Sequence, residues 1–304
     1  MGTHSLPASS DVISHVLSSF PRVASHEGLT SLSGVWSELV LQDIAAIVRP
    51  TGPENKCCSN VQQHPECYEM RDEKFGCRHY WRSVPSLTVH GCQFETREQM
   101  NGVSSYLDGT GIYGATDDKL HLIKTYEDGK VNLTACELCE QTDHNALGLL
   151  HRVFLREHNR VAEKLAETNV HWDDAKLFLE ARRIVVAQLQ HVTLNEYIPA
   201  ILREAVQVDH ELRPLANGFY AGYSSSNKAG TYNAVALAAL RALVWTRADK
   251  IGGLENHIIT SANGIGVAAA PDAAAWSMHV ARDHGVPGYV KYLTNCLEEY
   301  IKVS

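Results

Sequence analysis

The sequence has 304 residues and a mass of 33.6 kDa, with 44% hydrophobic and 20% charged residues. This composition is typical of a soluble globular chain and excludes collagen, coiled coil and intrinsic disorder. The net charge is −8 and Lys and Arg form no cluster, so we expect no nucleic-acid partner. No segment approaches the roughly 18 consecutive apolar residues of a membrane helix, and residues 1–7 lack the apolar core of a signal peptide. We therefore expect no membrane span and interpret the sequence as a mature or trimmed form.

The first half of the sequence predicts short helices and long loops. Helical stretches are expected at residues 11–20, 33–48 and 97–106. A Cys-rich loop at residues 51–95 separates the second stretch from the third, and Asp128-Gly129 marks a turn further along the chain.

The eight cysteines allow two interpretations, a metal cluster and a disulfide framework. The only C-x-x-C motif is Cys136–Cys139, and no second such motif lies at the distance expected of a zinc ribbon. The vicinal pair Cys57–Cys58, among Gly, Pro, Asn and Ser residues, is typical of a stapled loop in an oxidising compartment. The triplet Asn132-Leu133-Thr134 is a candidate N-glycosylation acceptor, which agrees with secretion. Disulfides and an extracellular location are therefore favoured.

The second half of the sequence predicts longer helices. Apolar residues in the range 147–165 recur at three- and four-residue steps, the pattern of an amphipathic helix. A second helix, long and largely buried, is expected after Trp172, with Asp173 and Asp174 at its start because carboxylates interact favourably with the helix dipole there. A third helix, at residues 232–248, is so rich in Ala, Leu and Val that we expect it in a core.

The chain shows no sign of a division into several domains. It contains no internal repeat, and no Pro-rich or Ser-rich linker interrupts it. We therefore predict a single, mainly α domain over residues 1–304, with the Cys-rich loop at 51–95 and a helical core at 97–304.

Three groups of residues are candidates for chemistry. His151 and His158 share a helix face, but no H-E-x-x-H spacing is present, so structural roles are favoured over a metal or general-base site. The charged trio in the segment Arg282–Tyr289 is interpreted as a structural corner because Gly and Pro residues follow it. A third group offers oxygen ligands of the kind that Ca²⁺ prefers, although a solvated turn is an equal alternative: Ser104, Tyr106, Asp108 and Thr110.

Five groups of residues, in this order along the chain, resemble the successive motifs of the animal haem peroxidase family, which includes peroxidasin and myeloperoxidase. They are Arg97–Asn101, Ser104–Asp108 with Ile112–Gly114, Leu155–Arg160, Ala181–Val185 and Arg282–Tyr289. The match extends over nearly the whole chain, which makes it far more specific than any single motif. It implies a mainly α fold in which long helices enclose a haem, with a calcium site beside the distal helix. It also implies that the family's domain continues beyond the end of this sequence, so the chain resembles a shortened member.

The distal side of the expected haem site departs from the family. The resemblance places the distal histidine, which exchanges a proton with peroxide, in the block Trp36–Asp43, and this sequence has Gln42 at that position. Glutamine has no group that takes and returns a proton near neutral pH. The carboxylate that precedes the histidine and can esterify the haem is replaced by Leu41, which has no oxygen for that bond.

Two further catalytic positions are also changed. The family's distal arginine corresponds to Glu140 or to Asn145, depending on the alignment, and the loss of such a charge donor typically lowers a rate by about 10²- to 10³-fold. Asp143 is a weak replacement for the second haem-linking carboxylate. The family's proximal iron ligand corresponds to Val244, which offers iron no lone pair. The sequence therefore has no catalytic residue at the three degenerate positions.

The calcium positions of the family are retained. The resemblance pairs Asp43 with the 104–110 loop and so favours calcium over a solvated turn. The implied ligands are Asp43, Ser104, the main-chain oxygen of Tyr106, Asp108 and Thr110. The resemblance also favours disulfides that close short loops, namely Cys57–Cys67, Cys58–Cys77 and Cys92–Cys136, and leaves Cys139 and Cys296 undecided.

Two functions are consistent with these residues. The favoured hypothesis is a secreted pseudo-peroxidase, catalytically inactive and haem-free, that keeps calcium and binds a protein, a matrix component or a small apolar molecule. The alternative is a haem-binding peroxidase, dependent on hydrogen peroxide, that uses substitute ligands from among His144, His151 and His191. The joint loss of three catalytic elements favours the first. A fragment that cannot fold alone is a third interpretation, and the sequence leaves the partner and the oligomeric state open.

Overall fold

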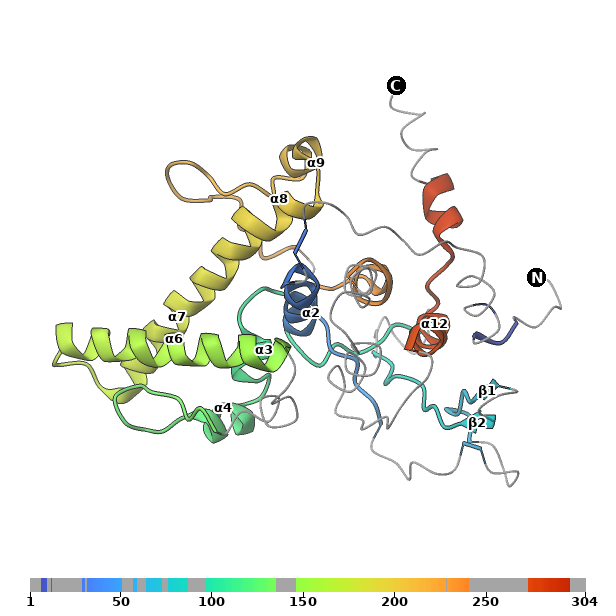
Figure 1. The fold of residues 1–304 in the computed structure, drawn as a ribbon, viewed down its shortest axis with the longest axis horizontal. Coiled ribbons are helices and arrows are strands. Elements are labelled where there is room, and N and C mark those ends of the chain that lie inside the picture. The colour runs from blue at the N-terminus through green and yellow to red at the C-terminus, as the bar shows by residue number, and fades with distance from the viewer. Residues whose placement is uncertain are drawn as a thin grey trace.

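The computed structural model is predominantly helical (Figure 1). It describes residues 7–9, 12, 29–30, 32–50, 57–58, 64–72, 76–86, 97–134, 146–227, 229–240 and 273–295. Within these ranges the strands form one two-stranded sheet. The mainly α class expected from the sequence is therefore confirmed. Nearly all of the helix expected at 11–20, and residues 241–248 of the third long helix, lie outside the described residues.

Two long helices form an antiparallel pair at one side of the molecule (Figure 1): α6 (Ala146–Thr168) and α7 (Asp174–Val192). Both were expected from the apolar spacing. Asp173 is the N-cap of α7, and its carboxylate accepts a hydrogen bond from the backbone N–H of Lys176 at 2.8 Å. The expectation that this second helix is largely buried is wrong. Only one face packs inward, and Leu179 on the other face is 55% exposed.

The chain continues from α7 through a π-helical turn, η1 (Thr193–Tyr197), into the short helix α8 (Ile198–Ile201) and then α9 (Glu204–Asp209). Pro199 lies in the first turn of α8, where its missing N–H is tolerated. The described start of the third expected helix also contains a π-helical turn, η2 (Val235–Ala239), with Leu237 buried. A π-helical turn widens the helix locally, and such turns are common near functional sites.

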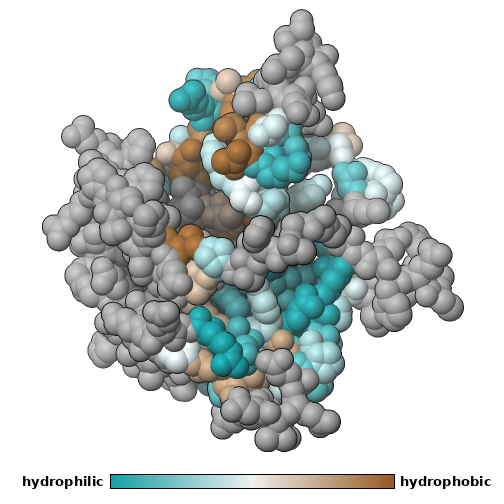
Figure 2. All heavy atoms as spheres, turned by 90° about the vertical axis from the view of Figure 1, so that its right-hand side faces the viewer, coloured by the Kyte–Doolittle hydropathy of each residue, from teal (hydrophilic) through white to brown (hydrophobic). Residues whose placement is uncertain are grey.

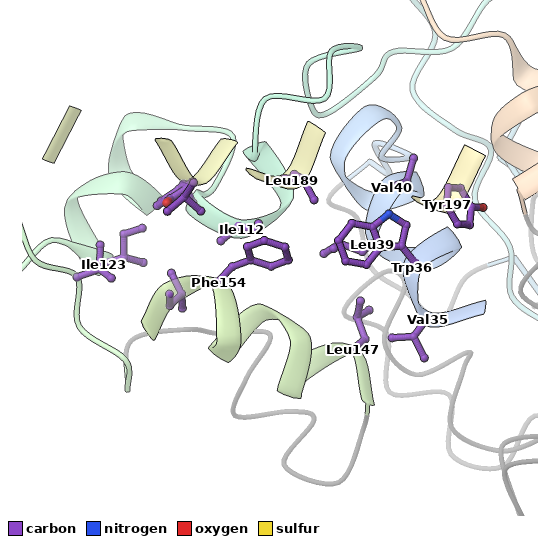
Figure 3. Packing of buried hydrophobic residues seen from close by; sticks show 14 of the residues in the cluster. Val35, Trp36, Leu39, Val40, Ile112, Ile123, Leu147, Phe154, Leu189 and Tyr197 are labelled. Carbon is purple, nitrogen blue, oxygen red and sulfur yellow. The ribbon is translucent and has the colours of Figure 1, made fainter. Parts of the chain in front are cut away.

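The helix α2 (Leu32–Ile44) lies at the centre of the core, beside the short helix α3 (Thr110–Tyr113), which is followed by α4 (Asp117–Ile123). Nine of its 13 residues are buried. Figure 3 shows Trp36 and Leu39 of α2 packed with Leu147 and Phe154 of α6. The Trp36 indole N–H also donates a hydrogen bond of 3.1 Å to the hydroxyl of Thr193. These contacts fix the position of α2 and so of the residues in its last turn, Gln42 and Asp43.

The helix expected at residues 97–106 is not formed. This segment instead makes isolated antiparallel bridges, Gln99 with Pro85 and Asn101 with Ile47. The Asn101 side-chain amide accepts from the backbone N–H of Ala46 at 2.8 Å and donates to the backbone carbonyl of Ile44 at 2.9 Å. These side-chain bonds to a distant backbone replace the local hydrogen bonds of a helix.

The Cys-rich loop contains the antiparallel hairpin of β1 (Met70–Asp72) and β2 (Gly76–Arg78). Disulfides join Cys57 to Cys67 and Cys58 to Cys77. Both are pairings that the family resemblance implies, so the described part of the loop is a disulfide framework. Cys92 and Cys136, the third implied pair, lie outside the described residues, as do Cys139 and Cys296.

The helix α12 (Ala273–Asp283) lies on the same side of the molecule as the hairpin (Figure 1), and residues 289–295 form a further helical segment after it. Figure 2 shows this side of the molecule, with hydrophilic side chains frequent in its lower half and apolar ones gathered in its upper half. None of the helices in the described ranges combines the length and apolarity needed to cross a bilayer.

Candidate functional site

The end of α2 carries the two adjacent residues on which the sequence argument depends, Gln42 and Asp43. Asp43 is 1% exposed. Its carboxylate oxygens accept hydrogen bonds from the backbone N–H groups of Gly109, at 3.0 Å, and Gly111, at 2.7 Å. Gly109 has φ 75°, a conformation that favours glycine, and so lets the loop turn sharply towards α2. The loop before α3 is therefore fastened to the end of α2 by one carboxylate.

Burial raises the pKa of Asp43 from 3.8 to about 6. The hydrogen bonds from Gly111 and Gly109 oppose this rise, and the nearby negative charge of Asp108 adds to it. Two carboxylates that approach each other in a buried position repel one another, and a cation between them would relieve that repulsion. The negative charges of Asp43 and Asp108 therefore favour a bound cation between them.

The loop supplies oxygen atoms of the type that calcium binds. The Asp108 carboxylate accepts hydrogen bonds from both the backbone N–H and the hydroxyl of Thr110. Asp43, Asp108 and Thr110 are thus brought together. Ser104 and Tyr106 lie on a more exposed part of the loop, where the Tyr106 N–H donates to the Ser104 hydroxyl at 3.1 Å. An oxygen-only donor set fits a hard cation such as Ca²⁺, which takes carboxylate, hydroxyl and main-chain oxygens.

Gln42 precedes Asp43 but has a different environment. Its side-chain carbonyl oxygen is buried, and no described residue donates a hydrogen bond to it. A neutral amide at this position has acceptor and donor atoms but no proton to exchange near neutral pH. The neighbouring Leu41 is 6% exposed and offers only apolar surface. Gln42 and Leu41 themselves therefore offer no group that takes and returns a proton near neutral pH.

The two histidines of α6 differ sharply. His158 is fully hydrogen-bonded, because its Nδ1 pairs with the Tyr113 hydroxyl at 3.0 Å and its Nε2 with the Gly129 carbonyl at 2.9 Å. His151 is equally buried, yet neither of its ring nitrogens has a hydrogen-bond partner among the described residues. Burial lowers the pKa of His151 to about 4, so the ring is neutral at physiological pH. With respect to the described residues, His151 therefore has an unpaired ring nitrogen with a lone pair, whereas His158 does not.

The remaining candidate positions are placed as follows. His191 is exposed at the end of α7, and its Nδ1 is paired with the amide of Asn195 at 3.1 Å. It therefore does not share the buried environment of His151. The other candidate positions lie outside the described residues: Glu140, Asp143, His144, Asn145 and Val244.

The segment Arg282–Tyr289 proves to be the partner of the Cys-rich loop. At the end of α12, Asp283 accepts hydrogen bonds from the Tyr80 hydroxyl at 3.0 Å, the Arg82 guanidinium at 2.6 Å and the Ser83 backbone N–H at 3.0 Å. Burial raises the pKa of Asp283, but the bonds from Arg82, Ser83 and Tyr80 outweigh it and hold the pKa below its ordinary value. At the structural corner expected from the sequence, the Asp283 carboxylate is therefore charged and is hydrogen-bonded to three groups of the Cys-rich loop.

His284 extends this link. Its Nε2 lies 2.6 Å from the Ser83 hydroxyl, and its Nδ1 lies 3.0 Å from the Asn233 amide oxygen. The order Ser, His and Asn is that of a hydrolytic triad, but Ser83 is only 1% exposed, so no substrate reaches its hydroxyl. We therefore assign these residues a structural role. Sequence reasoning missed Tyr80, Ser83 and Asn233, since no local signal connects positions about 50 to 200 residues apart.

Comparison with known proteins agrees with this geometry. The family model described as animal haem peroxidase matches residues 2–265, and the chain therefore belongs to the animal haem peroxidase family. Human peroxidasin homolog is 29% identical over 292 residues, which cover 78% of this chain and 19% of that protein. Peroxidase mlt-7 of Caenorhabditis elegans is 28% identical over 243 residues, which cover 71% of this chain and 33% of that protein. The chain thus spans a fifth to a third of the length of these relatives.

A comparison of folds agrees with this assignment at the level of the fold. The structure of peroxidase A from Dictyostelium discoideum superposes with a TM-score of 0.58, covering 89% of this chain and 66% of that chain. The identity is 17%, so the likeness is one of fold.

Proposed function

We propose that this chain is a secreted, haem-free pseudo-peroxidase that keeps the family's scaffold and acts by binding. The observation that carries the proposal is Gln42, which stands directly before Asp43 at the end of the buried α2. A peroxidase needs a group there that takes and returns a proton, and an amide does not do so. The replacements at Glu140 and Val244 support the same conclusion from the sequence.

Calcium is the resident metal in this proposal. Asp43 and Asp108 supply the charge, while Thr110, Ser104 and the main-chain oxygen of Tyr106 supply the remaining oxygens. A cation there offsets the cost of burying Asp43 and joins α2 to the loop before α3. This role is structural and independent of haem. The proposed binding partner is a protein, a matrix component or a small apolar molecule.

The haem-free proposal is tested by absorption spectroscopy. The full chain is purified from a secreting host supplied with haem, and its spectrum is recorded before and after hemin is added, with peroxide-dependent oxidation of a phenol measured on the same sample. We expect a folded protein with no Soret band and no turnover above that of free hemin. A Soret band with turnover in the natural chain would overturn the proposal.

Gln42→His is the matched variant for this test. It restores the distal base while leaving the other degenerate positions unchanged. We expect it to remain inactive, because the proximal position is still Val244. Turnover that appears only in Gln42→His would mean that haem is already bound and that the glutamine alone blocks the reaction, which contradicts the haem-free proposal.

The calcium proposal is tested by thermal unfolding with calcium and with a chelator. We expect the melting temperature of the natural chain to fall by several degrees on chelation, and Asp43→Asn or Asp108→Asn to abolish the difference. Asp118→Asn is the control, since Asp118 is an exposed carboxylate in the first turn of α4. Equal chelator sensitivity of all three variants and the natural chain would exclude a calcium site at Asp43.

A second function is favoured by one specific observation, the buried His151, whose two ring nitrogens have no partner among the described residues. Under this alternative the chain binds haem through a substitute ligand and works as a hydrogen-peroxide-dependent oxidoreductase. His151→Leu and His191→Leu distinguish the two functions. A Soret band that is lost in His151→Leu and kept in His191→Leu would support the alternative, whereas the absence of a band in all three proteins supports the haem-free chain.

A further inference from the structure

The turn that follows α4 ends in an acceptor triplet for N-linked glycans, Asn132-Leu133-Thr134. It is the only Asn-X-Ser/Thr triplet in the sequence. Asn132 is exposed, whereas its neighbour Val131 is 2% exposed and belongs to the main hydrophobic cluster. The triplet thus starts at a point where the chain leaves the core, and the function proposed above does not involve it.

The backbone at this point is fixed by contacts that direct Asn132 outward. Val131 is held by the side chain of Asn159 on α6, through Val131 N–H to Oδ1 at 2.7 Å and Nδ2 to the Val131 carbonyl at 2.9 Å. The next N–H, that of Asn132, donates to the Ile123 carbonyl at 2.7 Å. Two successive anchored residues leave the Asn132 side chain no place in the core, and a bulky group attached to it would extend into solvent.

The side-chain amide of Asn132 is itself oriented. Its Oδ1 accepts hydrogen bonds from the backbone N–H of Thr134 at 2.9 Å and from the Thr134 hydroxyl at 2.7 Å. The oxygen is therefore occupied on the chain's own side. No described residue accepts a hydrogen bond from the amide nitrogen Nδ2. The arrangement leaves the nitrogen, the atom that receives a glycan, as the free end of the side chain.

We propose that Asn132 carries an N-linked oligosaccharide. The sugar donor is an oligosaccharyl diphosphate lipid. A bond forms between Asn132 Nδ2 and the anomeric carbon of the first sugar, the bond between that carbon and the diphosphate oxygen breaks, the lipid diphosphate leaves, and the amide loses one proton to a base of the transferring enzyme. The inference rests on passage through a secretory compartment and not on the absence of haem, so the two proposals fail separately.

The competing interpretation is that Thr134 only stabilises the turn. Asn and Thr side chains form such turns in many loops without any modification. The two interpretations differ in what the hydroxyl does, because a turn-stabilising role affects stability and an acceptor role affects glycan attachment. Thr134→Ser keeps the hydroxyl, and Thr134→Ala removes it while leaving Asn132 in place.

The experiment expresses the full chain behind a cleavable host secretion signal in eukaryotic cells, and the secreted and cell-associated protein are both collected. Peptide N-glycosidase is applied in water labelled with heavy oxygen, which leaves one labelled aspartate at each released site. The tryptic peptide spanning residues 131–152 is then measured by mass spectrometry after reduction and alkylation of its cysteines. Asn132→Gln is the control without the acceptor asparagine.

We expect the label at position 132 in most of the natural chain and of Thr134→Ser, and none in Thr134→Ala or Asn132→Gln. Because attachment is read on total protein, a variant that folds poorly still reports on the site. An unlabelled peptide from natural chain in which Cys57–Cys67 and Cys58–Cys77 are oxidised would overturn the proposal. Equal labelling of Thr134→Ser and Thr134→Ala would show that the label does not depend on the hydroxyl and arises from deamidation of Asn132 rather than from a released glycan, which would also overturn the proposal.

Discussion

At the scale of single residues, α6 contains two buried histidines with opposite energetics. His158 exchanges its hydrogen bonds with water for bonds to Tyr113 and Gly129. His151 gives up its bonds with water and gains none from the described residues. An unsatisfied buried polar group costs about 1–3 kcal/mol, whereas a satisfied one is close to neutral. The same residue type, one heptad apart on one helix, is therefore favourable in one place and unfavourable in the other.

This contrast predicts opposite effects of the same substitution. His151→Leu removes two nitrogens that no described residue satisfies, and we expect it to raise the free energy of unfolding by about 1 kcal/mol. His158→Leu leaves the Tyr113 hydroxyl and the Gly129 carbonyl without partners, and we expect a loss of about 2 kcal/mol or more. Urea denaturation of the haem-free protein measures both. A destabilised His151→Leu would show that the imidazole is engaged in the folded chain and would contradict this account.

At the scale of elements, α7 is positioned by the two acidic residues at its start. Asp173 caps the helix through the N–H of Lys176, and Asp174 accepts a hydrogen bond from the Gly129 N–H at 2.7 Å. Gly129 has φ 67°, and a Cβ there would lie 2.5 Å from the backbone nitrogen of Phe178. The adjacent carboxylates thus have separate tasks. Asp173 caps the start of α7, and Asp174 holds the turn at Gly129 against the helix.

We expect Asp173→Ala to lower the free energy of unfolding by about 1 kcal/mol, because the capping bond is lost. Glu180→Ala is the matched control on the same helix. Glu180 pairs with Arg183, but the arginine side chain is 76% exposed, and exposed pairs contribute little. Denaturant midpoints of the two variants test the prediction, and an equal loss in both would show that α7 does not depend on its cap.

The elements show which parts of the fold a sequence reveals. The bounds of α6 and α7 follow from apolar spacing and from Asp173, because those signals are local and the helices satisfy their own backbone. Residues 97–106 failed as a helix because the Asn101 side chain bonds to the backbone near residue 45, a partner that no local pattern contains. The expectation of a helix at these residues rests on local propensity, and contacts with distant residues override propensity.

The candidate site divides in the same way. The family resemblance links Asp43 to the 104–110 loop. The hydrogen bonds that Asp43 accepts from Gly109 and Gly111 could be located only in three dimensions. The unpartnered state of His151 and the link from Asp283 to Tyr80 depend on packing between distant segments. The sequence therefore identifies the residue types available for chemistry, and the fold decides which of them have partners.

At the scale of the whole molecule, Asp283 joins the disulfide-bonded loop to α12. Its three donors come from residues 80–83, about 200 positions earlier in the chain. We expect Asp283→Asn to cost about 2–3 kcal/mol, because an amide cannot accept all three bonds and leaves the Arg82 guanidinium unpaired. Tyr80→Phe removes one donor and is expected to cost about 1 kcal/mol. Thermal or urea unfolding measures both losses of stability. An Asp283→Asn variant as stable as the natural chain would show that this link does not hold the two regions together.

The pH dependence of stability brings the buried groups together. Burial lowers the pKa of His151 and of His284 from 6.5 to about 4. For His284 the charge of Asp283 opposes the shift, and Arg49, Arg82 and Arg97 add to it. A lowered histidine pKa means that the unfolded chain takes up protons first, so this stability is complete above about pH 6.5 and is lost as the pH falls towards 4.

The pKa shift of Asp43 has the opposite effect on the pH dependence of stability. Its pKa is raised to about 6, so the folded chain takes up a proton first, and the cost of its buried charge disappears between about pH 6 and pH 4. The two histidines outweigh the one aspartate, and the lowered pKa of Asp283 acts in the same direction as the histidines, so we expect a net loss of stability between pH 7 and pH 4. Urea titrations with a chelator present measure this loss. We expect His151→Leu to reduce this loss, because it removes a histidine that destabilises the folded chain in acid, and Asp43→Asn to increase it, because it removes the opposing aspartate. A loss that neither variant alters would mean that other groups control the acid response.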